Sequence, residues 1–273
     1  MCDICVMNSV KERMLSRRHL FKGAAMTTAA AALGTVVSAP TAMADGHASV
    51  MDMTHMVDET FPTYFGSPGI SREAMNTFAK DGFNLNTFTV MEHTGTHIDA
   101  PLHFSADGQS VDEIPVSSLV CPLAVIDIAA RAAGNADTQV TPDDLKAWIS
   151  ANGPIPDSAC VAMHSGWAAK VRTDGFRNAD AEGKMHFPGF HIEAVKMLME
   201  ETRAKSIAVD TLSLDHGLSA DFAVHYGWLP TNRYGIECMA GLDQVPAAGA
   251  TLVVGAPKFG KGTGGPARIF AMV

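Results

Sequence analysis

The segment 92–104, EHTGTHIDAPLHF, restricts the possible folds of this chain more than any other part of the sequence. Its first two histidines, His93 and His97, have the i, i+4 spacing found on metal-binding helices. A helix is nevertheless disfavoured, because Gly95, the β-branched residues at 94, 96 and 98, and Pro101 all oppose helical geometry. We therefore expect an extended segment whose side chains alternate between two faces.

An extended backbone puts His93, His97, Asp99 and His103 on one face. In a straight strand His97 and Asp99 lie about 7 Å apart, whereas His93 lies roughly 13 Å from His97. Ligand atoms must approach a metal to about 2.1 Å, so a straight strand cannot bring both histidines to one ion. We predict a sharp bend at Gly95, which lets His93, His97 and Asp99 surround one divalent cation.

These residue types indicate hydrolytic chemistry. Two imidazoles and a carboxylate suit Zn²⁺ or Mn²⁺ and leave a position for water, which the ion activates for attack on a carbonyl carbon. His103 follows the rigid Ala100-Pro101 pair and is the candidate general base that then protonates the leaving nitrogen. The alternative is a set of ordinary polar residues on a sheet face, which this density of imidazoles disfavours.

Composition indicates one globular domain. The 273 residues suffice for a well-formed core, and 47% hydrophobic with 18% charged residues excludes a disordered chain. A net charge of −9 argues against nucleic acid or an anionic membrane as partner and leaves a small molecule as the expected one. Cys121, Cys160 and Cys238 do not suggest a disulfide framework in a chain of this size.

The first 44 residues have the layout of a twin-arginine export signal. Arg17 and Arg18 precede a weakly apolar run over residues 23–37, and Ala42-Met43-Ala44 supplies an A-x-A-like cleavage site. The apolar run, about 15 residues long, is too short for a permanent membrane span. We expect residues 1–44 to be removed, leaving residues 45–273 as a single periplasmic domain without a membrane anchor.

Short apolar runs bounded by turn residues predict strands. Their positions are 84–92, 123–127, 160–164, 206–210 and 251–255. A helix is predicted to open at Thr141-Pro142 and to run to Ala151, and a second, with apolar residues on one face, covers 191–205. Strands outnumber helices, so the fold class is α/β or α+β with a mixed sheet.

The pattern HxGTHxDxPxH, which runs from His93 to His103, resembles the signature of the cyclase family of metal-dependent hydrolases. That family includes bacterial kynurenine formamidase and isatin hydrolase, and all seven fixed positions match. Further segments look like family landmarks in the usual order, so the resemblance covers nearly all of residues 45–273. These segments are 165–167, 187–189, 209–211, 234–237, 242–243 and 264–268.

The resemblance implies an α/β protein with the swivelling β/β/α fold, in which a mixed sheet rolls into a barrel-like core with outer helices. It also implies a homodimer or homotetramer, and one metal held by His93, His97 and Asp99. In the formamidase branch the equivalent of Asp99 bridges to a second metal, whose other ligands would here be His225 and Glu237. One or two ions of zinc or manganese are therefore expected.

Some residues keep two interpretations. Glu237 could instead form a salt bridge with Arg233, and Cys238 beside it departs from the family pattern without an evident meaning. Asp210, Asp215 and His216 lie where a strand ends in a loop, and a structural or pocket-wall role is favoured for all three. In the formamidases an early aromatic residue packs on the substrate ring, and candidates for this role that could equally be core residues are Phe61, Tyr64 and Phe65.

The leading hypothesis is therefore a metal-dependent hydrolase that opens a C–N amide, formamide or lactam bond in a small aromatic molecule. The alternative is a non-catalytic periplasmic protein that binds a metal or ligand, in which His103 has no task. A serine hydrolase is disfavoured, because Ser165 lacks the G-x-S-x-G context of a nucleophile elbow.

Overall fold

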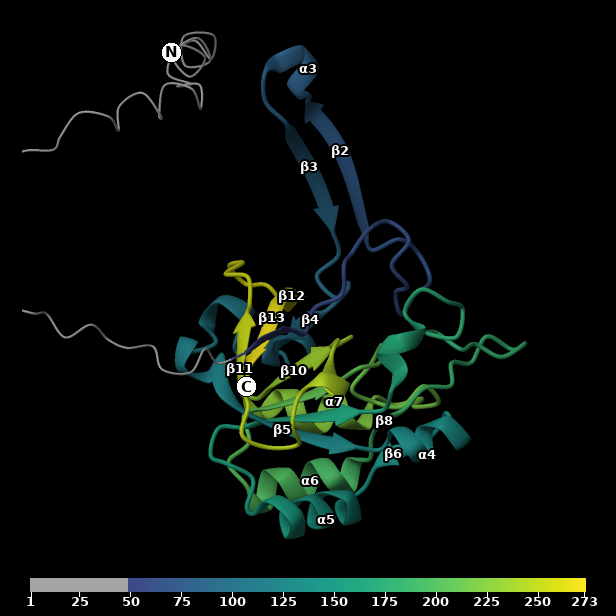
Figure 1. Ribbon diagram of the computed structural model, residues 1–273, viewed down its shortest axis with the longest axis vertical. Helices are drawn as coiled ribbons and strands as arrows, with labels where there is room; N and C mark the ends of the chain where they lie inside the picture. The colour runs from purple at the N-terminus through teal and green to yellow at the C-terminus, as the bar shows by residue number, and fades with distance from the viewer. Residues whose placement is uncertain (1–48) are drawn as a thin grey trace, which may run out of the picture. The chain divides into compact units, whose positions relative to one another are not determined.

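The computed structural model describes residues 49–273 (Figure 1). The predicted export signal, which includes Cys2 and Cys5, lies outside the described residues. Within the described part, residues 74–87 form a compact unit that is separate from residues 49–73 and 88–273. None of the helices between residues 49 and 273 has the length and hydropathy needed to cross a bilayer.

A two-stranded sheet comprises β2 (Ile70–Asn76) and β3 (Leu85–Val90), with the short helix α3 (Phe78–Asp81) between them in sequence. The strand predicted at 84–92 is thus confirmed. Helix α3 ends at Gly82, whose positive φ of 78° favours glycine. All residues of β3 are exposed.

The larger unit is built on a nine-stranded sheet with the order β1-β13-β11-β5-β7-β9-β10-β4-β12. The four central strands β5, β7, β9 and β10 are parallel, and antiparallel pairs flank them on both sides. The bounds are β1 (Val50–Asp52), β4 (His97–Asp99), β5 (Val120–Asp127), β7 (Cys160–His164), β9 (Ser206–Val209), β10 (Tyr234–Glu237), β11 (Thr251–Gly255), β12 (Gly264–Pro266) and β13 (Arg268–Met272).

The four strands predicted here by short apolar runs are confirmed as β5, β7, β9 and β11. Strand β7 shows why such runs form central strands: Val161 and Met163 pack on one face, while Cys160 and Ala162 pack on the other. A parallel strand covered on both faces needs apolar residues at successive positions, so it shows no alternation.

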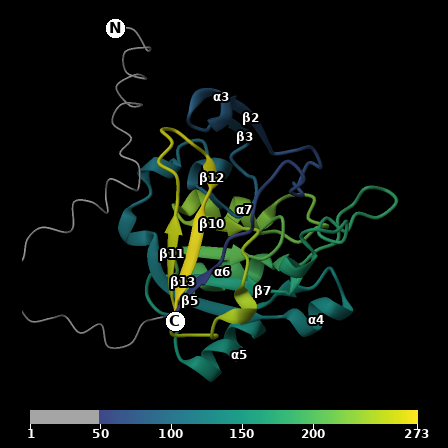
Figure 2. The same ribbon diagram turned by 45° about the horizontal axis from the view of Figure 1, so that its top comes forward.

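Helices α5 (Pro142–Asn152) and α6 (Ile192–Glu201) cover one face of the curled sheet (Figures 1 and 2). Thr141 and Asp144 form the capping box that opens α5, as the Thr-Pro start predicted. Helix α6 ends before the predicted residue 205, because Thr202 is extended and its hydroxyl donates to the Leu198 carbonyl. Apolar side chains such as Leu198 each contribute about 1.5–3 kcal/mol when fully buried.

The opposite face of the sheet buries a second cluster that includes Ile98, Ile236 and Leu252. The fold class is therefore the predicted one: a mixed α/β protein with a curled sheet and outer helices. The remaining elements are α4 (Ala129–Gly134), β6 (Gln139–Val140), β8 (Gly189–Phe190), α7 (Ala223–Trp228) and the 3₁₀ helices η1 (Pro101–Phe104), η2 (Val111–Glu113), η3 (Val116–Ser118), η4 (Trp167–Lys170), η5 (Leu229–Thr231) and η6 (Leu242–Gln244).

Candidate metal centre

The backbone breaks at Gly95, as the sequence predicts. Gly95 has a φ of +70°, and a Cβ at this position would lie 2.2 Å from Cγ2 of Val57, so only glycine fits. Strand β4 begins just after the break, at His97. The bend brings the ring centroids of His93 and His97 to 5.2 Å from each other. The bend therefore brings the two imidazoles next to each other, which a straight strand would not allow, although their nitrogens fall into different groups of potential ligands.

The register of β4 and β10 assembles the buried part of this centre. Glu237 lies directly opposite His97, and Gly235 lies opposite Asp99. The His97 Nε2 atom is 3.4 Å from a Glu237 oxygen and 3.4 Å from an Asp99 oxygen. A side chain on residue 235 would crowd Asp99, because its Cβ would lie 3.2 Å from Oδ2. Two strands far apart in sequence thus converge on one buried carboxylate–imidazole cluster.

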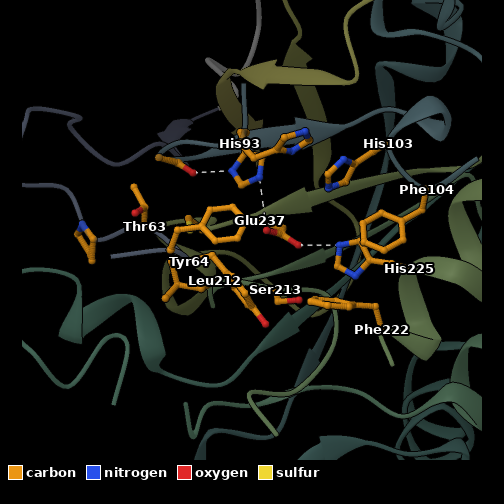
Figure 3. A pocket seen from close by; sticks show the side chains of 15 residues that line it. Thr63, Tyr64, His93, His103, Phe104, Leu212, Ser213, Phe222, His225 and Glu237 are labelled. Atoms are coloured by element: carbon orange, nitrogen blue, oxygen red, sulfur yellow. Dashed lines mark hydrogen bonds and ion pairs between the residues drawn. The ribbon is translucent and has the colours of Figure 1, made fainter. Parts of the chain in front are cut away.

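Helix α7 adds His225 to the cluster. Its Nε2 atom lies 3.2 Å from Oε1 of Glu237 and 3.7 Å from Oδ2 of Asp99 (Figure 3). The structure thus brings together His225 and Glu237, the pair implied by the family resemblance. Arg233 does not pair with Glu237; it donates to the Ala204 carbonyl instead. The alternative role considered for Glu237 is therefore not observed.

Hydrogen bonds assign the tautomers of two buried histidines. The Nδ1 atom of His97 lies 2.8 Å from the Gly95 carbonyl, so Nδ1 carries the proton. The Nδ1 atom of His225 lies 2.6 Å from Asp215, whose carboxylate also accepts the backbone N–H groups of Val224 and His225. In the neutral form of both rings, Nε2 is then the nitrogen without a proton, and it faces carboxylate oxygens.

An imidazole lone pair that faces a carboxylate lone pair is repelled by it, so a cation, either a proton or a metal ion, must lie between the two atoms. Among the described residues, His97 Nε2 and Asp99 Oδ2 are buried and have no hydrogen-bond partner. Burial acts to lower the pKa of His97, but the adjacent carboxylates of Asp99 and Glu237 outweigh it and raise that pKa to about 10. Burial acts to raise the pKa of Asp99, yet hydrogen bonds from three histidines hold it well below its usual value. The cluster therefore attracts positive charge, and its donor atoms fit a divalent metal.

The potential ligands form two groups that share Asp99. One contains His93, Asp99 and His103, the other His97, Asp99 and Glu237, and within each group the ligand atoms lie within 4.8 Å of one another. The 3₁₀ helix η1 turns His103 back so that its ring stacks on His93, with centroids 3.7 Å apart. Burial lowers the pKa of His103 to about 4, so the ring is neutral at neutral pH.

A cavity of about 280 Å³ adjoins the cluster. Its walls include the aromatic side chains of Tyr64, Phe65, Phe104 and Phe222, and none of the described residues that line it is lysine or arginine (Figure 3). Of the three aromatic candidates from sequence, Tyr64 and Phe65 line the cavity and Phe61 does not. Phe65 lines the cavity and is 79% exposed, whereas Phe61 is buried in the core against Phe176 and is not part of the cavity wall.

Sequence reasoning missed several site residues. Phe104 and Phe222 flank His225, with Phe104 at 4.5 Å between ring centroids, and no local pattern marks either residue. Asp215 was noted only as a loop residue, yet it orients His225. Asp210 has a structural role, because it is fully buried and accepts from the amide and hydroxyl of Ser165.

Residues 51–216 match the family model described as putative cyclase. The chain belongs to the cyclase family. It is 31% identical over 219 residues to an isatin hydrolase of Roseibium aggregatum, covering 76% of this chain and 82% of that protein. A kynurenine formamidase of Salinibacter ruber is 34% identical over 110 residues, which cover 33% of this chain and 51% of the formamidase.

A solved structure of isatin hydrolase A from Labrenzia aggregata, bound to benzyl benzoate, has a similar fold. The TM-score is 0.75 with 34% sequence identity, over 82% of this chain and 93% of that one. The expected family is thus confirmed, and the chain is a metal-dependent amide hydrolase of the cyclase family.

Proposed function

We propose that this enzyme opens the C–N bond of a small, neutral aromatic amide, either a lactam or an aryl formamide. One observation carries the proposal: a cluster of imidazole nitrogens and carboxylates opens into an aromatic cavity whose described lining residues include no lysine or arginine. Small-molecule sites commonly combine apolar walls with a few convergent polar groups.

The chain's own residues suit amide hydrolysis. Divalent cations held by His93 with Asp99, and by His97 with Asp99 and Glu237, would supply an acidified water and polarise the substrate carbonyl. His103 is neutral and adjoins this cluster, so it can accept a proton as the carbonyl is attacked. The resulting imidazolium, with its low pKa, is a strong acid and can protonate the leaving nitrogen.

The cavity wall favours substrates without a carboxylate. Its uncharged polar side chains include Thr63 and Ser213, and no lysine or arginine is among the described residues that line it. An amino-acid formamide would bring a carboxylate into this wall without a lysine or arginine partner, whereas a flat neutral ring can pack against Tyr64 and Phe222. The longer match to an isatin hydrolase than to a formamidase supports the same preference.

The two groups of potential ligands support a proposal for the number of ions. Because both groups include Asp99, we propose that its carboxylate bridges two ions of zinc or manganese, one beside His93 and one beside His97 and Glu237. His225 then completes the second position. For His103 to act as the base, it must remain unbound to either ion.

A direct experiment compares metal-loaded with chelator-treated enzyme on a matched panel of isatin, a formanilide, an amino-acid formamide and a cyclic imide. We expect turnover only with metal. The neutral ring amides should have a kcat/KM at least about tenfold higher than the amino-acid formamide, because an unpaired buried charge costs more than about 1.4 kcal/mol. Metal-stripped protein that hydrolysed the panel at full rate would refute the proposal. Loaded protein inactive on every amide would favour the non-catalytic alternative.

Export and assembly are proposals of a different kind. The sequence of residues 1–44 supports export to the periplasm by the twin-arginine route, which mass spectrometry of the periplasmic protein would test through cleavage after Ala44. The exposed apolar side chains of Met75, Phe78, Leu85 and Phe88 support a homodimer or homotetramer that covers them. Light scattering of the purified enzyme measures the assembly directly.

A further inference from the structure

The third histidine of the centre, His93, has a support different from those of His97 and His225. Its Nε2 atom lies 3.0 Å from the Thr263 hydroxyl. That hydroxyl lies 2.6 Å from Oε2 of Glu92, and the backbone N–H of Thr263 donates to Oε1 of Glu92 at 3.0 Å. The Glu92 carboxylate therefore accepts two hydrogen bonds from one residue, which in turn contacts the imidazole.

The donors and acceptors in the chain from Glu92 through Thr263 to His93 indicate which atoms carry protons. An ionised carboxylate can only accept, so the single hydroxyl proton of Thr263 points to Glu92. The Thr263 oxygen must then accept from His93, which places a proton on Nε2. The other ring nitrogen, Nδ1, lies 2.7 Å from Oδ1 of Asp99, where it can donate to the carboxylate without a cation and offers a lone pair once a bound cation replaces that proton. This is the atom through which His93 can bind a cation.

The backbone on either side of Thr263 lies close to Glu92 and His93. A Cβ on Gly264 would lie 2.8 Å from Cε1 of His93 and 2.3 Å from the Ile98 carbonyl oxygen. A Cβ on Gly262 would lie 3.0 Å from Oε1 of Glu92. The Thr263 carbonyl accepts the Ala100 amide at 2.9 Å, which ties the segment 262–264 to the end of β4. The two glycines thus let the threonine sit between the carboxylate and the imidazole.

We propose that Glu92 and Thr263 are a positioning pair, which holds His93 in the Nε2–H tautomer and aims Nδ1 at the ion beside Asp99. The inference rests on the proposed metal-dependent function and extends it to two residues outside the ligand set. Residues that orient a metal-bound histidine commonly change metal affinity or activity by about 10–100-fold when they are replaced.

The test uses matched variants of the metal-loaded enzyme. Thr263→Val removes the hydroxyl at nearly constant shape, and we expect the metal to dissociate about 10–100-fold more readily in chelator competition. Thr263→Ser keeps the hydroxyl and should restore affinity close to that of the wild type. Thr173→Val is the control, since Thr173 is exposed and its hydroxyl donates only to a turn carbonyl.

Glu92→Gln tests the proton order. The new amide group can donate to the Thr263 oxygen, which would turn the hydroxyl proton toward His93 Nε2 and leave the proton on Nδ1. ¹⁵N spectra of the histidine rings should show a protonated Nε2 of His93 in the zinc-loaded wild type. In Glu92→Gln they should show the other tautomer and weaker zinc binding.

The outcomes separate the two proposals. Wild-type metal affinity in both Thr263→Val and Glu92→Gln would overturn the positioning role, as would a His93 bound to zinc through Nε2 in the wild type. Neither result would affect metal-dependent turnover of the wild-type enzyme. Metal-independent turnover would instead overturn the proposed function, and the ¹⁵N spectra would still report how His93 is oriented.

Discussion

The two sides of the metal centre are built in different ways. On one side His97, Glu237 and His225 are almost completely buried, with side-chain exposures of 3%, 7% and 4%. They come from β4, β10 and α7, and strand register or a buried carboxylate holds them. On the other side His93 is 25% exposed, and His103 lies on a short 3₁₀ helix. Side-chain contacts hold these two rings.

Because of this difference, the buried side should depend on the fold as a whole, whereas the open side should depend on a few local side-chain contacts. The buried side cannot change without disturbing paired strands, and its ionised groups are costly to leave unpaired in a low-dielectric interior. Metal bound there should therefore contribute to the stability of the fold. The open side adjoins the cavity, so its residues can be replaced with smaller effects on folding and more specific effects on turnover.

The largest loss of metal and turnover is expected from a change at Asp99, which both sides share. Asp99 belongs to both ligand groups, so Asp99→Asn should release the metal from both and reduce turnover to that of chelator-treated enzyme. Metal analysis and turnover on the same samples would check this. Retention of two ions per chain in Asp99→Asn would show that the sides are independent and that Asp99 does not bridge them.

His103 tests the open side alone. As a general base it should contribute about 10²–10⁴-fold, so His103→Ala should lower kcat by this factor and leave the metal content unchanged. A parallel loss of one ion per chain would instead identify His103 as a ligand. A decrease of less than about tenfold with full metal content would leave the reaction without its proposed base.

The pH dependence of turnover follows from the lowered pKa of His103. Because burial lowers that pKa to about 4, the ring is unprotonated and active as a base above this pH and becomes protonated below it. At saturating metal we expect the part of turnover that His103→Ala removes to decline only as the pH falls through about 4. A decline of this His103-dependent part centred near 6.5 would indicate a solvated imidazole and contradict the buried position of His103.

Asp215 tests the buried side. Asp215→Asn replaces the acceptor of the His225 Nδ1–H group with an amide, and we expect metal binding to weaken by about 10–100-fold. Because the group is buried, the free energy of unfolding should also decrease by about 1–3 kcal/mol. Thr263→Val on the open side is the matched comparison and should weaken metal binding with little loss of stability. Equal losses of stability in both variants would contradict the distinction between the two sides.

The bend that joins the sides is tested by the stability of the fold. Gly95→Ala imposes a Cβ on a residue with φ of +70°, which costs about 1–2 kcal/mol before the clash with Val57 is counted. Thermal unfolding should show this loss, and Val57→Ala in the same chain should relieve only the steric part. Unchanged stability in Gly95→Ala would mean that the bend is not strained.

The elements that could be predicted are those with local signals. The apolar runs predicted β5, β7, β9 and β11, and the Thr141-Pro142 start predicted α5, because burial and capping leave a pattern in adjacent residues. The extended conformation at β4 was also predicted, but its pairing with β10 and β12 and the hydrogen-bond partners of the ligands were not. A partner strand, or a partner residue such as Thr263, lies far from His93 in the sequence.

The sequence by itself determined the dense histidine segment, the bend at Gly95 and the type of metal chemistry, because steric limits and ligand types are properties of adjacent residues. Only the tertiary structure decided which groups face one another. The antiparallel register of β4 with β10 put Glu237 opposite His97, and helix α7 brought His225 to them. These placements depend on the packing of distant segments, and so do Phe61 in the core and the tautomer of His93. No local rule encodes that packing.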